Sequence, residues 1–490
     1  MMNIAKHNMF KGFIIVLINT LMIQISYSQR IKNDLVKPRI IVTTDITNEP
    51  DDQESLIRLL LYSNDIDIEG LIGSTGVWKL SNPATNVIHE CIDAYSKVVD
   101  NLKLHDKEYP SAQYLHKITT TGNIGYGMSH VSGRGSDGAR LIIKAVDKED
   151  SRPIWLLAWG GANTIAQAIW TVSQTRSEIE LNKFLSKLRI YDLAGQDDAG
   201  AWIAKNYPQI FLIRNVVAYK GMSFRFSGND WSHTRGGDES VVTKEWVKNN
   251  IQENHGPLGK LYPTALHLWE GDTPTYFYQM PNGLNDPEQQ WQGSWGGRFT
   301  KEKQKNVNII AQEYAGADCS KGCFINENQY KDYWLYADAE DSWTFENQNY
   351  KNVWAPIFRW RTDFQNDFAA RMDWCVQPYN SVNHPPIVVI NNDFTNKVTY
   401  IDVKPGSVLS FSARKSFDPD GNALNYQWWV YPEAGTYKGE VVLKNSKNNR
   451  IKFKTPNDLG LGETIHIILT VKDDGVPNLT RYRRVVLRHN

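Results

Sequence analysis

The chain lacks an excess of charge of either sign. Lysine plus arginine and aspartate plus glutamate both number 54 among the 490 residues, so the formal net charge is zero. Proteins that bind nucleic acid polymers concentrate positive charge to neutralise phosphates. The composition therefore argues against a nucleic acid partner. The length exceeds that of one ordinary hydrophobic core and predicts two or three domains.

Cysteine is also scarce, with four residues in the whole chain. Cys319 and Cys323 are separated by three residues and predict a small disulfide loop in an oxidising compartment. A zinc site would require further ligands at similar spacing, which the sequence does not offer. Two free thiols are the alternative for this pair.

Long apolar runs are missing beyond the N-terminus. Residues 1–29 are typical of a signal peptide, with a basic start at Lys6 and Lys11, an apolar stretch over 12–25 and small residues for cleavage over 26–29. The apolar stretch is short for a membrane span, and no cysteine follows it closely for a lipid anchor. We therefore expect a secreted or periplasmic mature protein without a stable membrane anchor.

The densest group of acidic side chains follows a short apolar run near the start of the mature chain. Residues 39–44 predict a buried parallel strand that ends at Asp45, and the leucine-rich residues 56–61 predict a helix. Asp51 and Asp52 then fall in the first helical turn, where free amides and the helix dipole tolerate negative charge. Ligands of open α/β sheets bind beyond the carboxyl ends of the strands, where this turn lies. The acidic density predicts a Ca²⁺ site or, less well, a Mg²⁺ site. The alternative is a capped helix whose surplus acids face solvent.

Short apolar runs alternate with amphipathic segments over residues 39–208, which is typical of βαβ units. One strand ends at Trp159 and enters a glycine-rich turn that lets backbone approach a ligand. Asn163 in this turn can cap a helix or bond a hydroxyl. Another strand ends in Gln196 and Asp197, again before a helix.

The last part of the chain has a different pattern. Residues 341–345 predict a late helix that closes the first domain, and the proline-containing residues 382–386 predict a stiff linker. Short alternating strands with turn signals follow, which is typical of a β-sandwich. Asp-rich turns at 418–422 and 473–474 resemble those of polycystic-kidney-disease-type and cadherin-like modules. Ordinary turn chemistry is their favoured role, with calcium binding as the alternative.

The acidic stretch resembles the metal-binding motif of inosine–uridine-type nucleoside hydrolases, in which an aspartate ends the first strand and an aspartate pair follows. The whole chain resembles more closely the secreted bacterial proteins described as cellulose-binding. This resemblance implies an α/β fold with a nucleoside-hydrolase-like, mostly parallel sheet flanked by helices, followed by a C-terminal immunoglobulin-like β-sandwich. The implied boundaries are residues 1–29 for the signal peptide, 30–380 for the first domain and 385–490 for the second.

The resemblance also implies a set of site residues. The residues that match calcium ligands are Asp45, Asp52, Asp272 and, through its backbone carbonyl, Trp159. Asp45 would act as general base. The residues implied to contact substrate are Asp51, Asn48, Asn163, Gln196 and Asp197. Two features depart from the family: five residues rather than three separate Asp45 from Asp51, and Gly271 stands where many of the enzymes carry a histidine.

Two functions remain open from these residues. The first is a secreted calcium-dependent hydrolase of glycosidic bonds, with a carbohydrate or glycoside as substrate. The second is a non-catalytic carbohydrate-binding or cellulose-binding protein that keeps the site as a calcium-stabilised remnant. The presence of all three candidate carboxylates favours the hydrolase, whereas the altered spacing and the missing histidine favour the binding protein. The sugar and the oligomeric state are not predicted.

Overall fold

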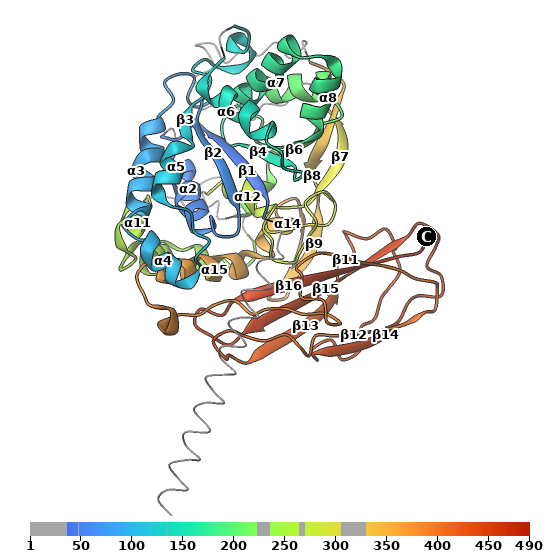
Figure 1. Cartoon of the computed structure of the whole chain (residues 1–490). Coiled ribbons are helices and arrows are strands. Elements are labelled where there is room, and N and C mark those ends of the chain that lie inside the picture. Colours follow the sequence, from blue (N-terminus) through green and yellow to red (C-terminus); the bar gives the residue numbers. More distant parts are fainter. Residues whose placement is uncertain (1–36, 48, 134, 223–235, 264–269, 305–329) are drawn as a thin grey trace, which may run out of the picture. The chain divides into compact units, whose positions relative to one another are not determined.

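The computed structural model describes residues 37–47, 49–133, 135–222, 236–263, 270–304 and 330–490. The predicted signal peptide, Asn48, Cys319 and Cys323 lie outside these residues. The described chain divides into two compact units (Figure 1). The first consists of Lys37–Met280 and Asn285–Val382, and the second of Pro281–Leu284 and Asn383–Asn490.

An eight-stranded sheet forms the centre of the first unit, in the order β3-β2-β1-β4-β5-β6-β8-β7 (Figure 1). Every adjacent pair is parallel except β7 with β8, which confirms the predicted mostly parallel sheet. The strands are β1 Arg39–Thr44, β2 Asp67–Gly73, β3 Thr119–Thr121, β4 Ile154–Ala158, β5 Leu188–Leu193, β6 Phe211–Asn215, β7 Phe299–Gln304 and β8 Tyr333–Asp338.

Strand β1 lies between β2 and β4 and is buried along its whole length. A strand covered on both faces needs apolar side chains at successive positions, and Ile40, Ile41 and Val42 provide them without exposed surface. Because β1 is parallel to both neighbours, its carboxyl end meets theirs at one edge of the sheet. Asp45 follows the strand at that edge.

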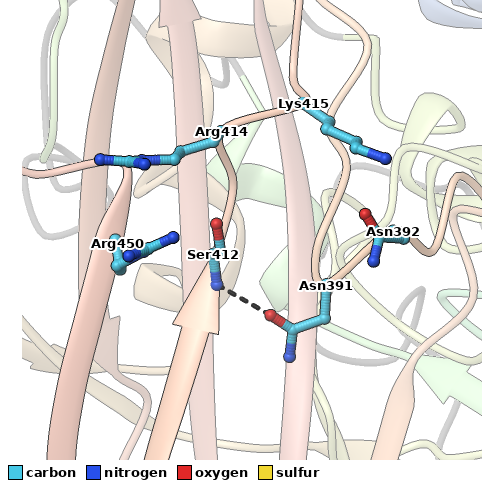
Figure 2. A pocket seen from close by; sticks show the side chains of 6 residues that line it. All are labelled: Asn391, Asn392, Ser412, Arg414, Lys415 and Arg450. Atoms are coloured by element: carbon cyan, nitrogen blue, oxygen red, sulfur yellow. Dashed lines mark hydrogen bonds between the residues drawn. The ribbon is translucent and has the colours of Figure 1, made fainter.

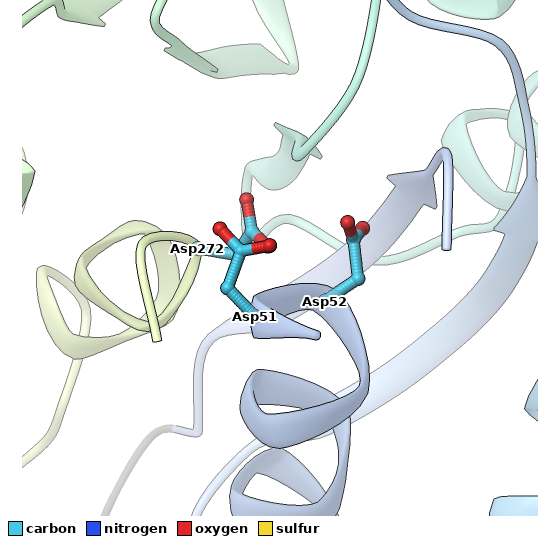
Figure 3. A group of neighbouring side chains, drawn as sticks. All are labelled: Asp51, Asp52 and Asp272. Atoms are coloured by element: carbon cyan, nitrogen blue, oxygen red, sulfur yellow. The ribbon is translucent and has the colours of Figure 1, made fainter. Parts of the chain in front are cut away.

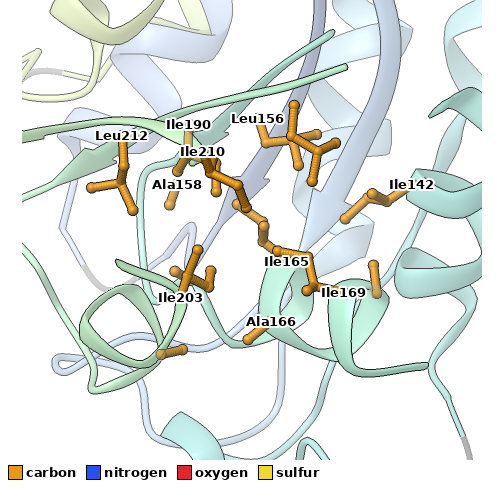
Figure 4. Packing of buried hydrophobic residues seen from close by; sticks show 14 of the residues in the cluster. Ile142, Leu156, Ala158, Ile165, Ala166, Ile169, Ile190, Ile203, Ile210 and Leu212 are labelled. Atoms are coloured by element: carbon orange, nitrogen blue, oxygen red, sulfur yellow. The ribbon is translucent and has the colours of Figure 1, made fainter. Parts of the chain in front are cut away.

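Helices flank the sheet and complete its core, as predicted. Figure 4 shows Ile165 and Ile169 of α7 (Asn163–Thr175) and Ile203 of α9 (Ala199–Asn206) in one cluster with sheet residues such as Leu156. Each fully buried side chain of this kind contributes about 1.5–3 kcal/mol. The other α-helices are α2 Asp51–Leu61, α3 Thr85–Tyr95, α4 Val99–His105, α5 Ala112–Lys117, α6 Asp137–Val146, α8 Glu178–Ser186, α10 Lys244–Val247, α11 Gly256–Leu261, α12 Thr273–Phe277, α14 Ala355–Phe358 and α15 Arg361–Asp373. Among the described residues, no helix combines the length and the apolar character needed to cross a membrane.

The segment 341–345 is a strand, so the helix predicted there is wrong. Strand β9 (Asp341–Phe345) pairs antiparallel with β10 (Gln348–Asn352) in a hairpin. Glu346 and Asn347 form its turn with φ values of 47° and 65°. Two successive left-handed residues are what a type I′ hairpin turn requires, and they cannot continue a helix.

The second unit contains two sheets that pack as a β-sandwich. One sheet has the order β11-β16-β15-β13, and β12 pairs with β14 in the other. Phe411 and Phe453 from the smaller sheet share one hydrophobic cluster with Trp428, Ile467 and Val485 from the larger, so the two sheets enclose a common core. The strands are β11 Thr399–Asp402, β12 Val408–Ser412, β13 Leu424–Val430, β14 Arg450–Lys454, β15 Thr464–Asp473 and β16 Thr480–Arg488.

The short segment Pro281–Leu284 belongs to this second unit although it is far from it in sequence. The backbone amide of Tyr482 donates to the carbonyl oxygen of Asn282 at 3.0 Å. The guanidinium of Arg484 donates to the carbonyl oxygen of Leu284 at 2.5 Å. Strand β16 therefore holds this segment through its backbone.

Candidate metal centre

The candidate site begins where β1 ends. Asp45 follows the strand directly and is 2 % exposed. The chain then turns through Thr47, whose φ of 86° is left-handed, and enters α2 at Asp51. Asp51 and Asp52 lie in the first turn of α2, as predicted, near the free amides of the helix start.

Asp272 joins the start of α2 from a distant part of the chain. It directly precedes α12 and is 1 % exposed. Asp51, Asp52 and Asp272 each offer one carboxylate oxygen, and these oxygens all lie within 4.8 Å of one another (Figure 3). Three buried carboxylates at this separation repel each other unless a positive charge lies between them.

Thr44 holds one of these carboxylates in place. Its hydroxyl donates to Asp52 Oδ1 and accepts from the backbone amide of Ile46 at 3.1 Å. The backbone thus orients the hydroxyl, and the hydroxyl orients Asp52. Thr44 is not among the site residues predicted from the sequence; its signal is a threonine placed directly before the strand-ending acid.

Asp45 lies against two glycine turns. A Cβ at Gly76 would be 2.2 Å from Asp45 Oδ2 and 2.6 Å from Gln196 Oε1, and a Cβ at Gly160 would be 2.7 Å from Asp45 Oδ1. A larger residue at either position would displace the carboxylate. Because both oxygens lie close to the same Cβ position at Gly76, Asp45 Oδ2 and Gln196 Oε1 are close neighbours.

Trp159 and Gln196 are paired with each other. Gln196 Nε2 donates to the backbone carbonyl oxygen of Trp159 at 2.6 Å, and the Trp159 indole donates to Thr275 Oγ1 at 2.7 Å. A carbonyl oxygen has two lone pairs, so this hydrogen bond leaves one of them for a cation. Gln196, predicted to contact substrate, thus lies beside two of the predicted metal ligands.

Asp45, Asp51, Asp52 and Asp272 are called the acidic cluster below. Burial and mutual repulsion raise the pKa values of these four carboxyls. Burial, followed by repulsion from Asp51, raises the pKa of Asp45 to about 7. Burial raises the pKa of Asp51 to about 6. Burial and then the neighbouring aspartates hold the pKa values of Asp52 and Asp272 well above their ordinary range. The protein by itself therefore stabilises the charged form of these carboxyls poorly, and a bound cation would reverse that.

Several buried oxygens of this cluster have no hydrogen-bond partner among the described residues. They are Asp45 Oδ2, Asp51 Oδ1, Asp272 Oδ2 and Gln196 Oε1. A buried acceptor without a partner costs free energy, so native structures rarely keep one without a reason. Carboxylate, amide and carbonyl oxygens are the donor atoms that calcium prefers. The residues present therefore fit a hard divalent cation.

Two residues predicted to contact substrate are engaged by the protein itself. Asn163 Nδ2 donates to Thr75 Oγ1 at 2.8 Å and to the carbonyl oxygen of Gly125 at 2.5 Å. Asp197 accepts from three backbone amides, including that of Asn163, at 3.0–3.1 Å. Both side chains thus hold turns at the carboxyl edge of the sheet, a long-range role that no local pattern indicates.

A separate hollow lies in the second unit (Figure 2). Its lining residues are Asn391, Asn392, Ser412, Arg414, Lys415 and Arg450. The backbone amide of Ser412 donates to Asn391 Oδ1 at 2.9 Å. Three cationic side chains give this hollow the opposite charge character to the acidic cluster, so it is not part of the candidate metal centre.

Comparison with protein families gives two matches. The family described as "Cellulose-binding Sde182, nucleoside hydrolase-like domain" matches residues 39–299. The family described as "Cellulose-binding protein Sde0182, C-terminal domain" matches residues 408–489. The first match spans more than half of the chain and includes all the clustered aspartates. The search of curated proteins gives no match.

Among solved structures, a nucleoside hydrolase-related hypothetical protein from Saccharophagus degradans, described as associated with carbohydrate metabolism, is 40% identical. The match covers 93% of this chain and 100% of that chain with a TM-score of 0.80. Human CDH23 EC21-23 is 17% identical over 24% of this chain and 35% of its own, with a TM-score of 0.17. The effector protein XOO4466 is 10% identical over 72% of this chain and 99% of its own, with a TM-score of 0.33.

Proposed function

Because the chain belongs to the family of Sde182-type cellulose-binding proteins with a nucleoside hydrolase-like domain, we propose that it is a calcium-dependent hydrolase of glycosidic bonds. The family description and the carbohydrate association of the Saccharophagus relative support a saccharide or glycoside as substrate. The signal peptide expected at residues 1–29 supports action in a secreted or periplasmic form.

The observation that carries the proposal is the set of buried acceptor oxygens on Asp45, Asp51, Asp272 and Gln196 that have no hydrogen-bond partner in the part of the chain that the structure describes. Hydroxyl groups of a bound sugar could satisfy one or two of these oxygens, but they would not offset the charge of the carboxylates. A divalent cation would do both. The proposed ligands are Asp45, Asp52, Asp272 and the carbonyl oxygen of Trp159, and Gln196 Oε1 is available as a further oxygen.

Calcium held there supplies positive charge that offsets the carboxylates and polarises nearby water and sugar oxygens. Asp45 is the proposed general base, because its carboxylate directly follows β1, is buried, and keeps an oxygen without a donor among the described residues. It would accept the proton of the attacking water. Asp51 would accept hydrogen bonds from sugar hydroxyls as positive charge develops on the ring.

One feature supports the alternative, a binding protein without turnover. A Cβ at Gly271 would lie 2.9 Å from Asp51 Oδ2 and 3.2 Å from a ring carbon of Tyr219. The glycine lets Asp51 and Tyr219 approach the backbone, so a histidine at this position would not fit the same arrangement. A hydrolase of this design would need its leaving group to be protonated from elsewhere.

The test is release of reducing sugar or nucleobase from a panel of oligosaccharides and nucleosides, with calcium and after chelation. We expect turnover that requires calcium and that falls at least about 100-fold in Asp45→Asn. Asp100→Asn is the matched control, since Asp100 is an exposed acid in the first turn of α4. If the protein binds calcium and glycan without turnover, the binding-protein function replaces the hydrolase function. If it shows neither binding nor turnover, the two functions are both contradicted.

A further inference from the structure

Two aspartates of the second unit lie on turns that are joined by hydrogen bonds and that the function proposed above does not use. Asp418 lies in the turn before β13, and Asp473 ends β15. Leu424, at the start of β13, is the register partner of Asp473. Both carboxylates are buried, with residue exposures of 5 % and 1 %.

Each of these carboxylates uses only one of its two oxygens within the protein. Asp418 Oδ1 accepts from the backbone amides of Asp420 at 2.9 Å and Asn422 at 3.1 Å. Asp473 Oδ1 accepts from Gly475 and Leu479 amides at 3.0 and 2.9 Å. Asp418 Oδ2 and Asp473 Oδ2 are buried and have no hydrogen-bond partner among the described residues.

Asn383 joins the two turns. Its Nδ2 donates to Asp473 Oδ1 at 2.9 Å, and its Oδ1 accepts from Asn422 Nδ2 at 2.7 Å. The backbone amide of Ala423 donates to Asp474 Oδ1 at 2.8 Å and closes the same junction. The two buried carboxylates are thus held on facing turns, and no ion pair of either is found among the described residues.

The hydrogen bonds of ordinary turns explain why the two Oδ1 atoms are buried. They do not explain why the two Oδ2 atoms are buried. An Asx-type turn needs one acceptor oxygen, and each Oδ1 already fills that role. Two further buried, negatively charged acceptors without donors among the described residues, on turns that Asn383 joins, are costly unless a cation offsets their charge. Both oxygens are hard ligands of the kind that calcium takes.

We propose that Asp418 and Asp473 bind a calcium ion through their Oδ2 atoms, at a site in the second unit that is separate from the acidic cluster of the first. Asn383 and the turns it joins hold the two carboxylates in place. Asp420 is not a ligand in this proposal, because it accepts from the His384 backbone amide at 2.6 Å and lies 3.0 Å from His384 Nδ1. With two carboxylates rather than four or five, we expect an affinity on the order of 0.1–1 mM, the range of extracellular calcium modules.

The test is calcium binding to the full chain by equilibrium dialysis, together with the calcium-dependent shift in Tm. The variant is Asp418→Asn/Asp473→Asn, in which each asparagine keeps an oxygen for the backbone amides and loses the charge. The matched control is Asp402→Asn on β11, a residue that is 62 % exposed and pairs with Arg488. All proteins are also prepared with Asp52→Ala, which removes the acidic cluster as a source of calcium binding.

We expect the Asp52→Ala chain to bind one calcium ion and to gain several degrees in Tm with calcium. The double variant in that background should bind more than about tenfold more weakly, while its Tm in chelator equals or exceeds that of the parent because repulsion is removed. The Asp402→Asn control should behave as the parent. Equal calcium binding and equal Tm gain in the double variant would overturn this site. If the chains with and without Asp52→Ala bind calcium equally, while the double variant binds none, the site at Asp418 and Asp473 is supported. That result would contradict only the calcium site at the acidic cluster of the first unit.

Discussion

At the scale of single residues, the acidic cluster is defined by a shortage of donors. Asp45, Asp51 and Asp272 each keep a buried oxygen without a partner among the described residues. The one side-chain donor to Asp52 that the structure describes is Thr44, which is itself held by the backbone of the turn. The geometry of the cluster therefore depends on a hydroxyl that has no contact with substrate in the proposal.

Thr44→Val is expected to weaken calcium binding about 10–100-fold, the usual effect of removing a group that orients a metal ligand. Thr43→Val is the matched control. Thr43 is the preceding residue of β1, and its buried hydroxyl has no hydrogen-bond partner among the described residues. Its replacement should leave calcium affinity unchanged and stability equal or slightly higher. Calorimetric titration of both variants makes the comparison, and equal affinities would remove Thr44 from the account.

The response to pH follows from the raised pKa values. Burial, then Asp51, raises the pKa of Asp45 to about 7 from an ordinary value of 3.8, and burial raises that of Asp51 to about 6. The folded, calcium-free protein thus binds more protons than the unfolded chain between about pH 4 and pH 7, and its stability falls as the pH rises through this window. Calcium competes with these protons. The gain in Tm with calcium should therefore grow from about pH 5 to about pH 8, and a gain independent of pH would contradict the coupling.

At the scale of elements, the site depends on holding the start of α2 against the segment that precedes α12. Arg58 of α2 forms a buried ion pair with Glu270 at 2.6 Å. Its guanidinium carbon also lies 3.9 Å from the ring centroid of Phe368 in α15. Glu270 is two residues before Asp272, so this ion pair fixes the distance between the two acidic segments.

Arg58→Met is expected to lower the free energy of unfolding by about 3–5 kcal/mol, because it leaves the Glu270 carboxylate buried without its partner. Calcium affinity should fall with it. Arg58→Met/Glu270→Gln is the matched double variant, since it removes the buried charge as well, and it should recover a substantial part of the lost stability. Urea denaturation of the three proteins measures the effect. A double variant less stable than Arg58→Met would show that the ion pair is not the cause.

At the scale of the whole molecule, the sequence predicts what depends on local periodicity. The apolar run of β1 predicts a buried parallel strand, and the position of Asp51 and Asp52 in the first turn of α2 follows from the leucines beyond them. The hairpin of β9 and β10 depends on the left-handed conformation of Glu346 and Asn347, which the sequence of this turn does not predict. The assignment of Pro281–Leu284 to the second unit rests on backbone contacts with β16, and such contacts have no signature in the segment itself.

The candidate site likewise has features that local sequence predicts and features that depend on long-range contacts. Acidic residues after a strand predict a metal centre, because carboxylates at that density need a cation. The engagement of Asn163 and Asp197 by turns of the protein depends on segments brought together by the sheet. The substrate contacts predicted for Asn163 and Asp197 rest on their positions after strands. Such a position does not reveal that the side chain is already hydrogen-bonded to other parts of the protein.

A calorimetric calcium titration of the full chain, compared with Asp272→Asn and with the exposed control Asp100→Asn, tests whether the acidic cluster binds calcium. Asp272 comes from a segment more than 200 residues away from α2 in sequence, so only the folded cluster connects it to Asp51 and Asp52. We predict a binding event that weakens more than about tenfold in Asp272→Asn and is unchanged in Asp100→Asn. Calcium binding that is the same in all three proteins would contradict a metal centre at this cluster.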